Sequence, residues 1–163
     1  MPTPTYTLLD SVTLTSSASS VTFSSISAAG KGDLVLSASL VNGHGSPNGV
    51  YLRFNSDTGS NYPLVRMVGN GSTAVSESYT FSYVDVATLG VASSSSGRVQ
   101  ISDFAATDKH KSILVRRDIS QYNTIAQANR WASTSPITSM LIYPSSNSFI
   151  AGDAFHLYQI VSE

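Results

Sequence analysis

The residues best suited to proton transfer or metal binding in this chain are its three histidines, His44, His110 and His156. A metal site or a general base needs such side chains to converge with carboxylates or with one another. The three lie far apart in the sequence, and none has a second ligand at the spacing of a metal-binding motif. We therefore predict no metal site. We expect His44 and His110 on exposed loops and His156 on the face of a strand.

A second candidate for metal chemistry is the segment in which Asn55, Asp57, Gly59 and Asn61 recur at every second position. Oxygen ligands at alternate positions suit calcium, which takes several oxygens from a flexible loop. The segment carries a single carboxylate, however, and Asn, Asp and Gly are also the residues of tight turns. We favour a hairpin loop over a calcium site, with Asn55, Asp57 and Asn61 fixing the backbone through their side chains.

The serines of the chain are abundant but lack the setting of a nucleophile. The sequence contains no Gly-x-Ser-x-Gly elbow, no phosphate-binding loop, no dinucleotide fingerprint and no cysteine. The glutamates are Glu77 and Glu163 alone, so a two-carboxylate glycosidase would need aspartates from separate loops. We predict that the protein is not an enzyme and that it uses no cofactor.

Aromatic and arginine side chains are the remaining candidates, because both are enriched in protein interfaces. Trp131, the only tryptophan, could serve as a stacking platform for a sugar, but a lone tryptophan more often closes one end of a core, which we favour. Arginine suits fixed ion pairs between subunits better than lysine does, and it is the commoner of the two here. The interface candidates are Tyr6, Tyr51, Arg53, Tyr62, Arg66, Arg116, Arg117 and Trp131.

The elements that would position these residues are short strands. Apolar residues recur at every second position in most of the chain, as in Leu34–Leu40, Val50–Phe54 and Phe155–Gln159. Clusters of Gly, Asn and Ser separate these runs, and only residues 124–131 could form a turn of helix. The spacing predicts an all-β protein, an antiparallel jelly roll or β-sandwich of about eight to ten short strands.

Length and composition limit the number of domains and the classes of partner. With 163 residues the chain is long enough for one domain, and we assign residues 1–5 to an extended N-terminal arm and residues 6–163 to a single β-sandwich. Charged residues make up 12% of the chain and the net charge is −1, which excludes a strong electrostatic attraction to nucleic acid. No apolar run approaches the length of a membrane span. We predict that neither nucleic acid nor a membrane is a direct partner.

Three blocks of the sequence resemble a family of small proteins from tailed phages, cyanophages included. They are residues 6–15, residues 51–62, which form the most specific block, and the stretch from Arg130 to Ile160. Many relatives end in Leu-Tyr-Gly-Ile, where this chain has Gln159 in place of the glycine. The resemblance implies a virion structural protein with a jelly-roll β-sandwich, commonly a homotrimer.

The resemblance also implies a function and a location. The first expectation is a capsid cement or decoration protein on the surface of the head, which trimerises and binds the lattice of the major capsid protein. The alternative is a receptor-binding or tail-fibre-tip module that recognises a host-surface glycan, which would place the chain on the tail. The absence of a long fibrous or coiled-coil stem favours the first. The implied partners are further copies of the chain, the major capsid protein and a glycan.

Overall fold

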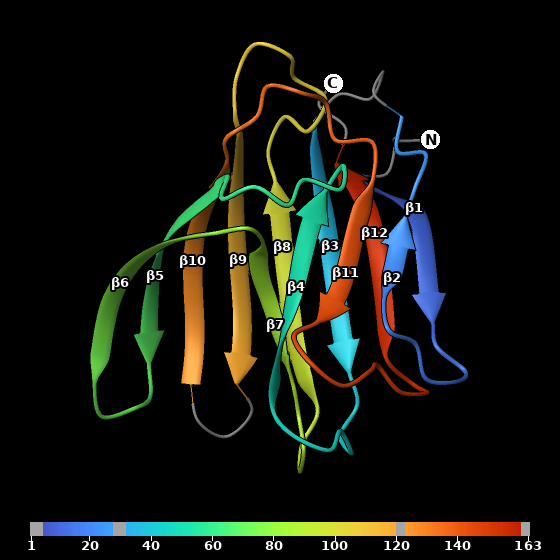
Figure 1. The fold of residues 1–163 in the computed structure, drawn as a ribbon, viewed down its shortest axis with the longest axis vertical. Helices are drawn as coiled ribbons and strands as arrows, with labels where there is room; N and C mark the ends of the chain where they lie inside the picture. Colours follow the sequence, from blue (N-terminus) through green and yellow to red (C-terminus); the bar gives the residue numbers. More distant parts are fainter. Residues whose placement is uncertain (1–4, 28–31, 120–122, 161–163) are drawn as a thin grey trace.

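The computed structural model describes residues 5–27, 32–119 and 123–160, which form two antiparallel sheets packed face to face (Figure 1). The larger sheet has the strand order β1-β12-β3-β8-β9-β10-β5-β6 and the smaller one β2-β11-β4-β7. The predicted all-β sandwich is confirmed, and none of the described residues forms a helix that could cross a membrane. Of the predicted extended N-terminus, residues 1–5, residues 1–4 lie outside the described part. The strands are β1 (Tyr6–Thr13), β2 (Val21–Phe23), β3 (Asp33–Leu40), β4 (Asn48–Phe54), β5 (Tyr62–Gly69), β6 (Ala74–Phe81), β7 (Val84–Leu89), β8 (Ser95–Ile101), β9 (Lys111–Ile119), β10 (Asn123–Trp131), β11 (Met140–Pro144) and β12 (Ala154–Ile160).

The turn of helix that residues 124–131 could have formed is absent, because this stretch is strand β10. Its side chains alternate between buried and exposed, and the buried ones include Gln127 and Asn129 beside Ile125 and Trp131. A strand whose buried face is partly polar lacks the apolar alternation by which strands are recognised in a sequence. This is why the strand is visible only in the sheet, where it pairs with β9 on one side and β5 on the other.

The hydrophobic core lies between the two sheets, under the central strands of the larger one. Leu34, Leu36 and Leu40 of β3 are completely buried there, facing a smaller sheet that contributes Leu52 and Phe54 of β4. Burial of each such side chain stabilises the fold by about 1.5–3 kcal/mol. Because successive side chains of a strand point to opposite faces of its sheet, every second side chain of the larger sheet points inward, and the others form the opposite face.

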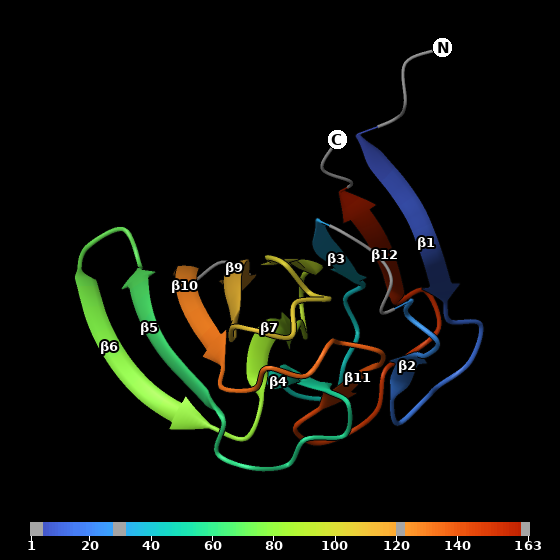
Figure 2. The ribbon, with the colours of Figure 1, turned by 90° about the horizontal axis from the view of Figure 1, so that it is seen from above.

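The smaller sheet is narrower than the larger one and covers only its middle. Figure 2 shows β5 and β6 extending beyond the four-stranded sheet at one end and β1 at the other. We call β5 and β6 together the arm, and we call the face of the larger sheet that points away from the smaller sheet the outer face. No described strand covers the outer face.

The two sheets come into backbone contact at Gly97 of β8. A Cβ atom at this position would lie 2.0 Å from the carbonyl oxygen of Val86 and 3.1 Å from the Cβ of Ala87, both in β7. A side chain here would therefore meet backbone rather than a flexible neighbour. Gly97 allows β7 to cross over β8 at backbone contact distance.

Replacing Gly97 by alanine should therefore push β7 away from β8. We expect Gly97→Ala to lower the free energy of unfolding by about 1–3 kcal/mol in urea denaturation, as overpacking does elsewhere. Gly69→Ala is the matched control, because Gly69 lies in β5 and a Cβ there would meet nothing within 4 Å. Equal stability of the two variants would contradict this account of the contact between the sheets.

Candidate functional site

The segment that carries Asn55, Asp57 and Asn61 connects β4 in the smaller sheet to β5 in the larger one. The predicted hairpin loop is therefore wrong, since the segment joins two sheets instead of two paired strands. Asn55 Oδ1 accepts hydrogen bonds from the backbone N–H groups of Thr138, at 2.9 Å, and Ser139, at 3.1 Å. These bonds tie the connection to the segment that leads into β11.

The Asp57 carboxylate lies at the centre of this connection. It accepts hydrogen bonds from the backbone N–H of Gly59 at 2.9 Å, the Asn61 side-chain amide at 3.0 Å and the Trp131 indole N–H at 2.7 Å. Burial alone would raise the pKa of Asp57, but these three hydrogen bonds to the charged form outweigh it and hold the pKa below its usual value. The carboxylate is thus committed to neighbouring groups of the chain.

The histidines do not converge. His44 is buried, which corrects the prediction that it is exposed, and its Nε2 lies 3.3 Å from Oδ2 of the fully buried Asp153. Asp153 also accepts hydrogen bonds from the backbone N–H groups of Val41 and Ile150, both at 3.0 Å. His110 is exposed, and no group of three or more His, Cys, Asp or Glu side chains in the described ranges is placed to hold a metal ion.

The eight interface candidates do not form one surface. Tyr62, Arg117 and Trp131 are buried inside the chain and cannot contact a partner, so for these three the prediction is wrong. Trp131 instead closes one end of the core, where its ring lies 5.4 Å from that of Phe54. The remaining five lie on three different surfaces. Tyr51 and Arg53 lie on the smaller sheet, and Arg66 lies on the inner side of the arm. Tyr6 and Arg116 lie on the outer face.

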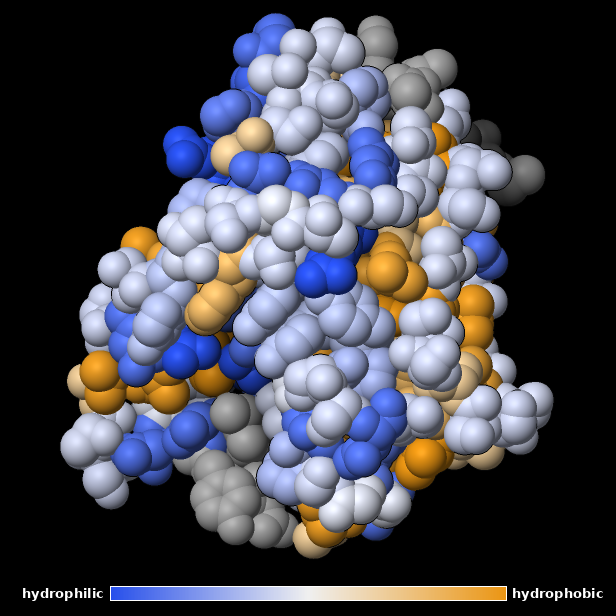
Figure 3. All heavy atoms as spheres, viewed as in Figure 1, coloured by the Kyte–Doolittle hydropathy of each residue, from blue (hydrophilic) through white to orange (hydrophobic). Residues whose placement is uncertain are grey.

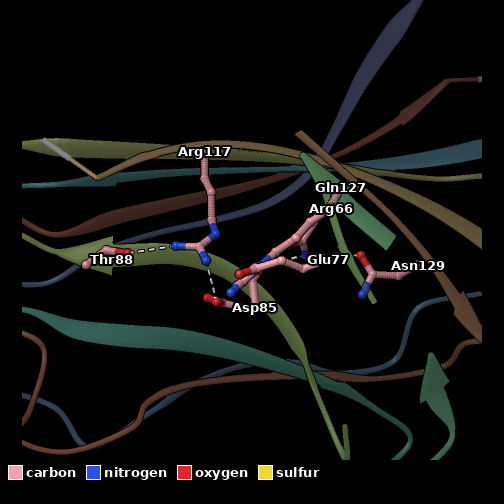
Figure 4. A network of polar contacts seen from close by, with 7 residues as sticks. All are labelled: Arg66, Glu77, Asp85, Thr88, Arg117, Gln127 and Asn129. Carbon is pink, nitrogen blue, oxygen red and sulfur yellow. Dashed lines mark hydrogen bonds and ion pairs between the residues drawn. The ribbon is translucent and has the colours of Figure 1, made fainter. Parts of the chain in front are cut away.

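A polar network fastens the larger sheet to β7 near the arm (Figure 4). Arg117 of β9 donates hydrogen bonds to the Asp85 carboxylate at 2.5 Å and to the Thr88 hydroxyl at 2.8 Å. Gln127 of β10 donates to the backbone carbonyl of Asp85 at 2.8 Å and to Oδ1 of Asn129 at 3.0 Å. Burial raises the pKa of Asp85 even though the guanidinium of Arg117 opposes that shift.

Four buried atoms of this network have no hydrogen-bond partner among the described residues: Asp85 Oδ1, Arg117 Nε, Gln127 Oε1 and Asn129 Nδ2. An unpaired buried polar group costs about 1–3 kcal/mol. Figure 3 shows hydrophilic residues in the hollow between the arm and the smaller sheet. The unpaired atoms are sealed from solvent. In this conformation the network joins β9 and β10 to β7 beside the arm and is not an open binding site.

A row of aromatic rings runs beside the network from the arm to the smaller sheet. Successive centroids lie 5.3, 5.0, 3.8 and 5.8 Å apart, and an arginine guanidinium lies over the ring at each end. Such aromatic pairs stabilise a fold by about 0.5–1.5 kcal/mol beyond their burial. Since the rings pack mainly on one another, their faces are largely occupied. The row consists of Tyr79, Phe81, Tyr83, Tyr51 and Tyr143.

The outer face carries two arginines that form no ion pair with a described carboxylate. Arg98 of β8 and Arg116 of β9 lie directly opposite each other on this face, and both are exposed. Within the described residues neither forms an ion pair with a carboxylate, and like charges directly opposite across a sheet are destabilising. Arg98 donates a hydrogen bond to the Tyr6 hydroxyl at 3.3 Å, with its guanidinium 5.7 Å from the centre of the Tyr6 ring.

The outer face is hollowed around these arginines. Tyr6, Arg98, Gln100, Leu114 and Arg116 line a depression of about 230 Å³. The two arginines also border a second depression, of about 390 Å³, on the side of Ser37, Ser96, Asp118 and Thr124. A third, of about 650 Å³, lies against Arg130 at the arm, with Pro63, Val65, Ser78, Thr80 and Ala128 around it.

Large apolar side chains also lie open on the outer face. Tyr6, Leu8, Val65, Met67 and Leu114 are between 46% and 63% exposed. Exposed apolar side chains rimmed by polar ones mark surfaces that bind a ligand or a partner. Sequence reasoning selected Tyr6 and Arg116 here but missed Arg98, because the pairing of β8 with β9 that brings the two arginines together is not visible in the sequence.

Comparison with known proteins gives no family for this chain: no family model matches it, and no curated protein does. Two solved structures of mutants of the alginate lyase Aly36B are similar to it. The complex with alginate tetrasaccharide is 10% identical, has a TM-score of 0.32, and the match covers 80% of this chain and 68% of that one. The complex with alginate trisaccharide is 9% identical, has a TM-score of 0.33, and the match covers 80% and 69%.

These findings contradict the predicted function. The matching solved structures are of an alginate lyase and not of a capsid cement protein or a tail-fibre tip, so the virion function is corrected and not carried further. The burial of Tyr62, Arg117 and Trp131 also removes three of the eight interface candidates. At this low similarity the comparison carries no argument for lyase activity, and the function must be argued from the geometry.

The Asp57 hydrogen bonds should make stability depend on pH. Because the pKa of Asp57 is lower in the folded chain, its contribution is complete above the unfolded value of about 4 and is lost as the pH falls through the folded value. We expect Asp57→Asn to lose about 1–3 kcal/mol of unfolding free energy near pH 7 and to lose less on acidification than the parent chain. Urea denaturation from about pH 7 to pH 2 measures both. Asp108→Asn, in an exposed loop, is the control and should follow the parent chain.

The buried pair of Asp85 and Arg117 should tolerate joint replacement better than the loss of one partner. Asp85→Ala leaves the Arg117 guanidinium buried without its carboxylate, and we expect a loss of about 3–5 kcal/mol in chemical denaturation. The double variant Asp85→Leu with Arg117→Met should lose clearly less, because no buried charge remains. Lys109→Ala breaks the exposed ion pair with Asp103 and should cost under about 1 kcal/mol. A double variant less stable than Asp85→Ala would refute this interpretation of the network.

Proposed function

We propose that this protein is a non-catalytic binding module that holds an acidic polysaccharide on the outer face of its larger sheet. The observation that carries the proposal is the facing pair of Arg98 and Arg116, two exposed guanidinium groups without a carboxylate partner among the described residues. A ligand that brings an anion between them would relieve their repulsion.

Carboxylate and sulfate groups fit this pair chemically. An arginine presents a planar set of donors that bonds two oxygens of one anion at the same time, and such charge-assisted bonds are stronger than neutral ones. Tyr6 accepts a hydrogen bond from Arg98 and so helps to hold the guanidinium in place. The depression between Tyr6, Leu114 and the two arginines offers apolar surface beside the charges, as a sugar ring with a carboxylate substituent requires.

The position of Arg130 favours an extended ligand over a single small anion. Arg116 lies opposite Ala126 of β10, and Arg130 follows on the same face four residues further along that strand, a distance of about 14 Å. Along β10 the exposed side chains between them are the small ones of Ala126 and Ala128, with Leu114 of β9 opposite Ala128 as an apolar border to this path. A polymer with repeated acidic groups can engage all three arginines at once.

The strength expected of this surface is moderate. Asp118 borders the second depression, where it accepts a hydrogen bond from the Ser96 N–H at 2.7 Å, and it offsets part of the positive charge. Since the net charge of the chain is −1, long-range attraction to polyanions in general is weak. Binding should therefore depend on fitting the arginines and should weaken with salt.

Titration of the full chain with alginate, followed by calorimetry, tests the proposal. We expect binding to the acidic polymer and none to neutral dextran, because only the former supplies carboxylates for Arg98 and Arg116. The double variant Arg98→Ala with Arg116→Ala should weaken binding at least tenfold, whereas Arg116→Lys, which keeps the charge but loses the two-pronged donor geometry, should fall in between.

Lys109→Ala is the control, since it removes one positive charge at an exposed site without touching the outer face. The alginate recovered after incubation should keep its chain length, as expected of binding without cleavage. Equal affinity for dextran, or full affinity in the double arginine variant, would refute the site. New reducing ends would refute the non-catalytic role.

A further inference from the structure

The outermost strand of the arm, β6, has an open edge along its whole length. Figures 1 and 2 show no described segment beyond it. It pairs with β5 in one unbroken register from Ala74 to Phe81, and it contains no proline or lysine. An exposed, regular edge strand presents unpaired backbone groups to another chain, which is why proteins usually protect such edges.

The other edge strands of the described structure are protected or short. The pairing of β1 with β12 is interrupted by an irregularity between Leu8 and Asp10, and Asp10 adds a charge there. In β7, the Gln127 side chain bonds the backbone carbonyl of Asp85. The remaining edge strand, β2, has three residues. The open edge of β6 is therefore a feature in which this strand differs from the others.

The arm also exposes apolar side chains on both of its faces. Val75 and Tyr79 are 49% and 41% exposed on the side toward the smaller sheet, while Val65 and Met67 are 54% and 63% exposed on the outer face. A two-stranded extension with open apolar groups on both sides has little of its own to hold it in water. Continuation of the sheet by another strand would cover part of both sides.

We propose that β6 pairs in antiparallel orientation with β6 of a second copy of this chain, about a two-fold axis at Ser78. In an antiparallel pair, directly opposite residues lie on the same face, so only certain residues can face each other. Centring the pair on Ser78 places Val75 opposite Phe81 of the second copy and Glu77 opposite Tyr79 of the second copy. The contacts are then an apolar pair, a carboxylate facing a tyrosine, and small serine and threonine side chains on the outer face.

The neighbouring registers are worse. Centring on Glu77 would bring two carboxylates together at the axis, which is destabilising. Centring on Tyr79 would place Glu77, which is paired with Arg66 of its own chain, opposite Phe81 of the second copy, where the carboxylate gains no polar contact across the interface. The sequence of β6 thus matches itself in the Ser78 register, as a two-fold interface between identical copies requires.

Such a dimer would join the two larger sheets edge to edge and keep their outer faces on the same side. A single eight-residue strand pair buries less area than the roughly 1,200–2,000 Å² of a stable interface, so we expect a weak dimer that forms with rising concentration. Because the dimer rests on β6 alone, it does not depend on the arginines of the outer face.

Cysteine cross-linking gives the sharpest test, because the natural chain contains no cysteine. Ser78 would face Ser78 of the second copy across the axis, at a Cα separation of about 4.5–5.5 Å, which a disulfide can span. We expect Ser78→Cys of the full chain to form a covalent dimer under mild oxidation. Ser112→Cys, which is also exposed on the outer face but lies in the middle of the sheet, should stay monomeric.

Analytical ultracentrifugation of the unmodified chain supplies the second measurement. We expect a monomer–dimer equilibrium, and we expect Ser78→Lys, which places two ammonium groups at the axis, to weaken dimerisation at least tenfold, with Ser112→Lys unchanged. Circular dichroism checks that each variant is folded. Three results would overturn the proposal: a chain that stays monomeric throughout, a trimer, or equal cross-linking of Ser78→Cys and Ser112→Cys. If the chain is a monomer, the open edge is available to a strand of a different protein.

Discussion

The larger sheet of this sandwich has eight strands and the smaller one four, and this difference in width sets what each part of the surface can do. Four strands cover only the middle of eight, so the apolar core forms under β12, β3, β8 and β9 and reaches the arm only at Tyr62, the first residue of β5. Where the cover is missing, the inward side chains change from leucine and isoleucine to Gln127, Asn129 and Arg66. The edge of the core and the edge of the smaller sheet thus coincide.

The arm is consequently held by polar contacts and by the aromatic row, with buried apolar packing limited to Tyr62 and Leu64 at the start of β5. Arg117, Asp85 and Gln127 link the larger sheet to β7 next to it, and Arg66 pairs with Glu77 within it. A network that leaves buried donors and acceptors unpaired gives less stability than a filled core of the same size. The arm is therefore the part of the sandwich that contact with another molecule would stabilise most.

The two-layer architecture leaves the whole outer face of the larger sheet without a covering strand among the described residues. An exposed face of this size is either polar or binds a partner or ligand. Here it carries both exposed arginines and exposed apolar side chains. The proposed polysaccharide site uses the centre of this face, and the proposed dimer uses its free edge. The two are compatible, because the edge contact keeps the outer faces of both copies open on one side.

How much could be predicted from the sequence depends on the range of the interaction. The alternation of apolar and polar residues is local, and it was sufficient for the all-β sandwich and for most of its strands. The preference of Trp131 for the core followed from its residue type alone. Strand β10 was not found, because Gln127 and Asn129 occupy the positions where a strand signal needs apolar side chains.

The candidate sites depend on which strands become neighbours, and no local pattern contains that information. Only the pairing of β8 with β9 brings Arg98 opposite Arg116. Only the packing of distant loops buries His44 against Asp153, 109 residues later in the chain. The sequence by itself determined most of the strands and the absence of a known catalytic motif. The tertiary structure decided which charges are buried, which stay free and which edge is open, because these follow from the order of strands in the sheets.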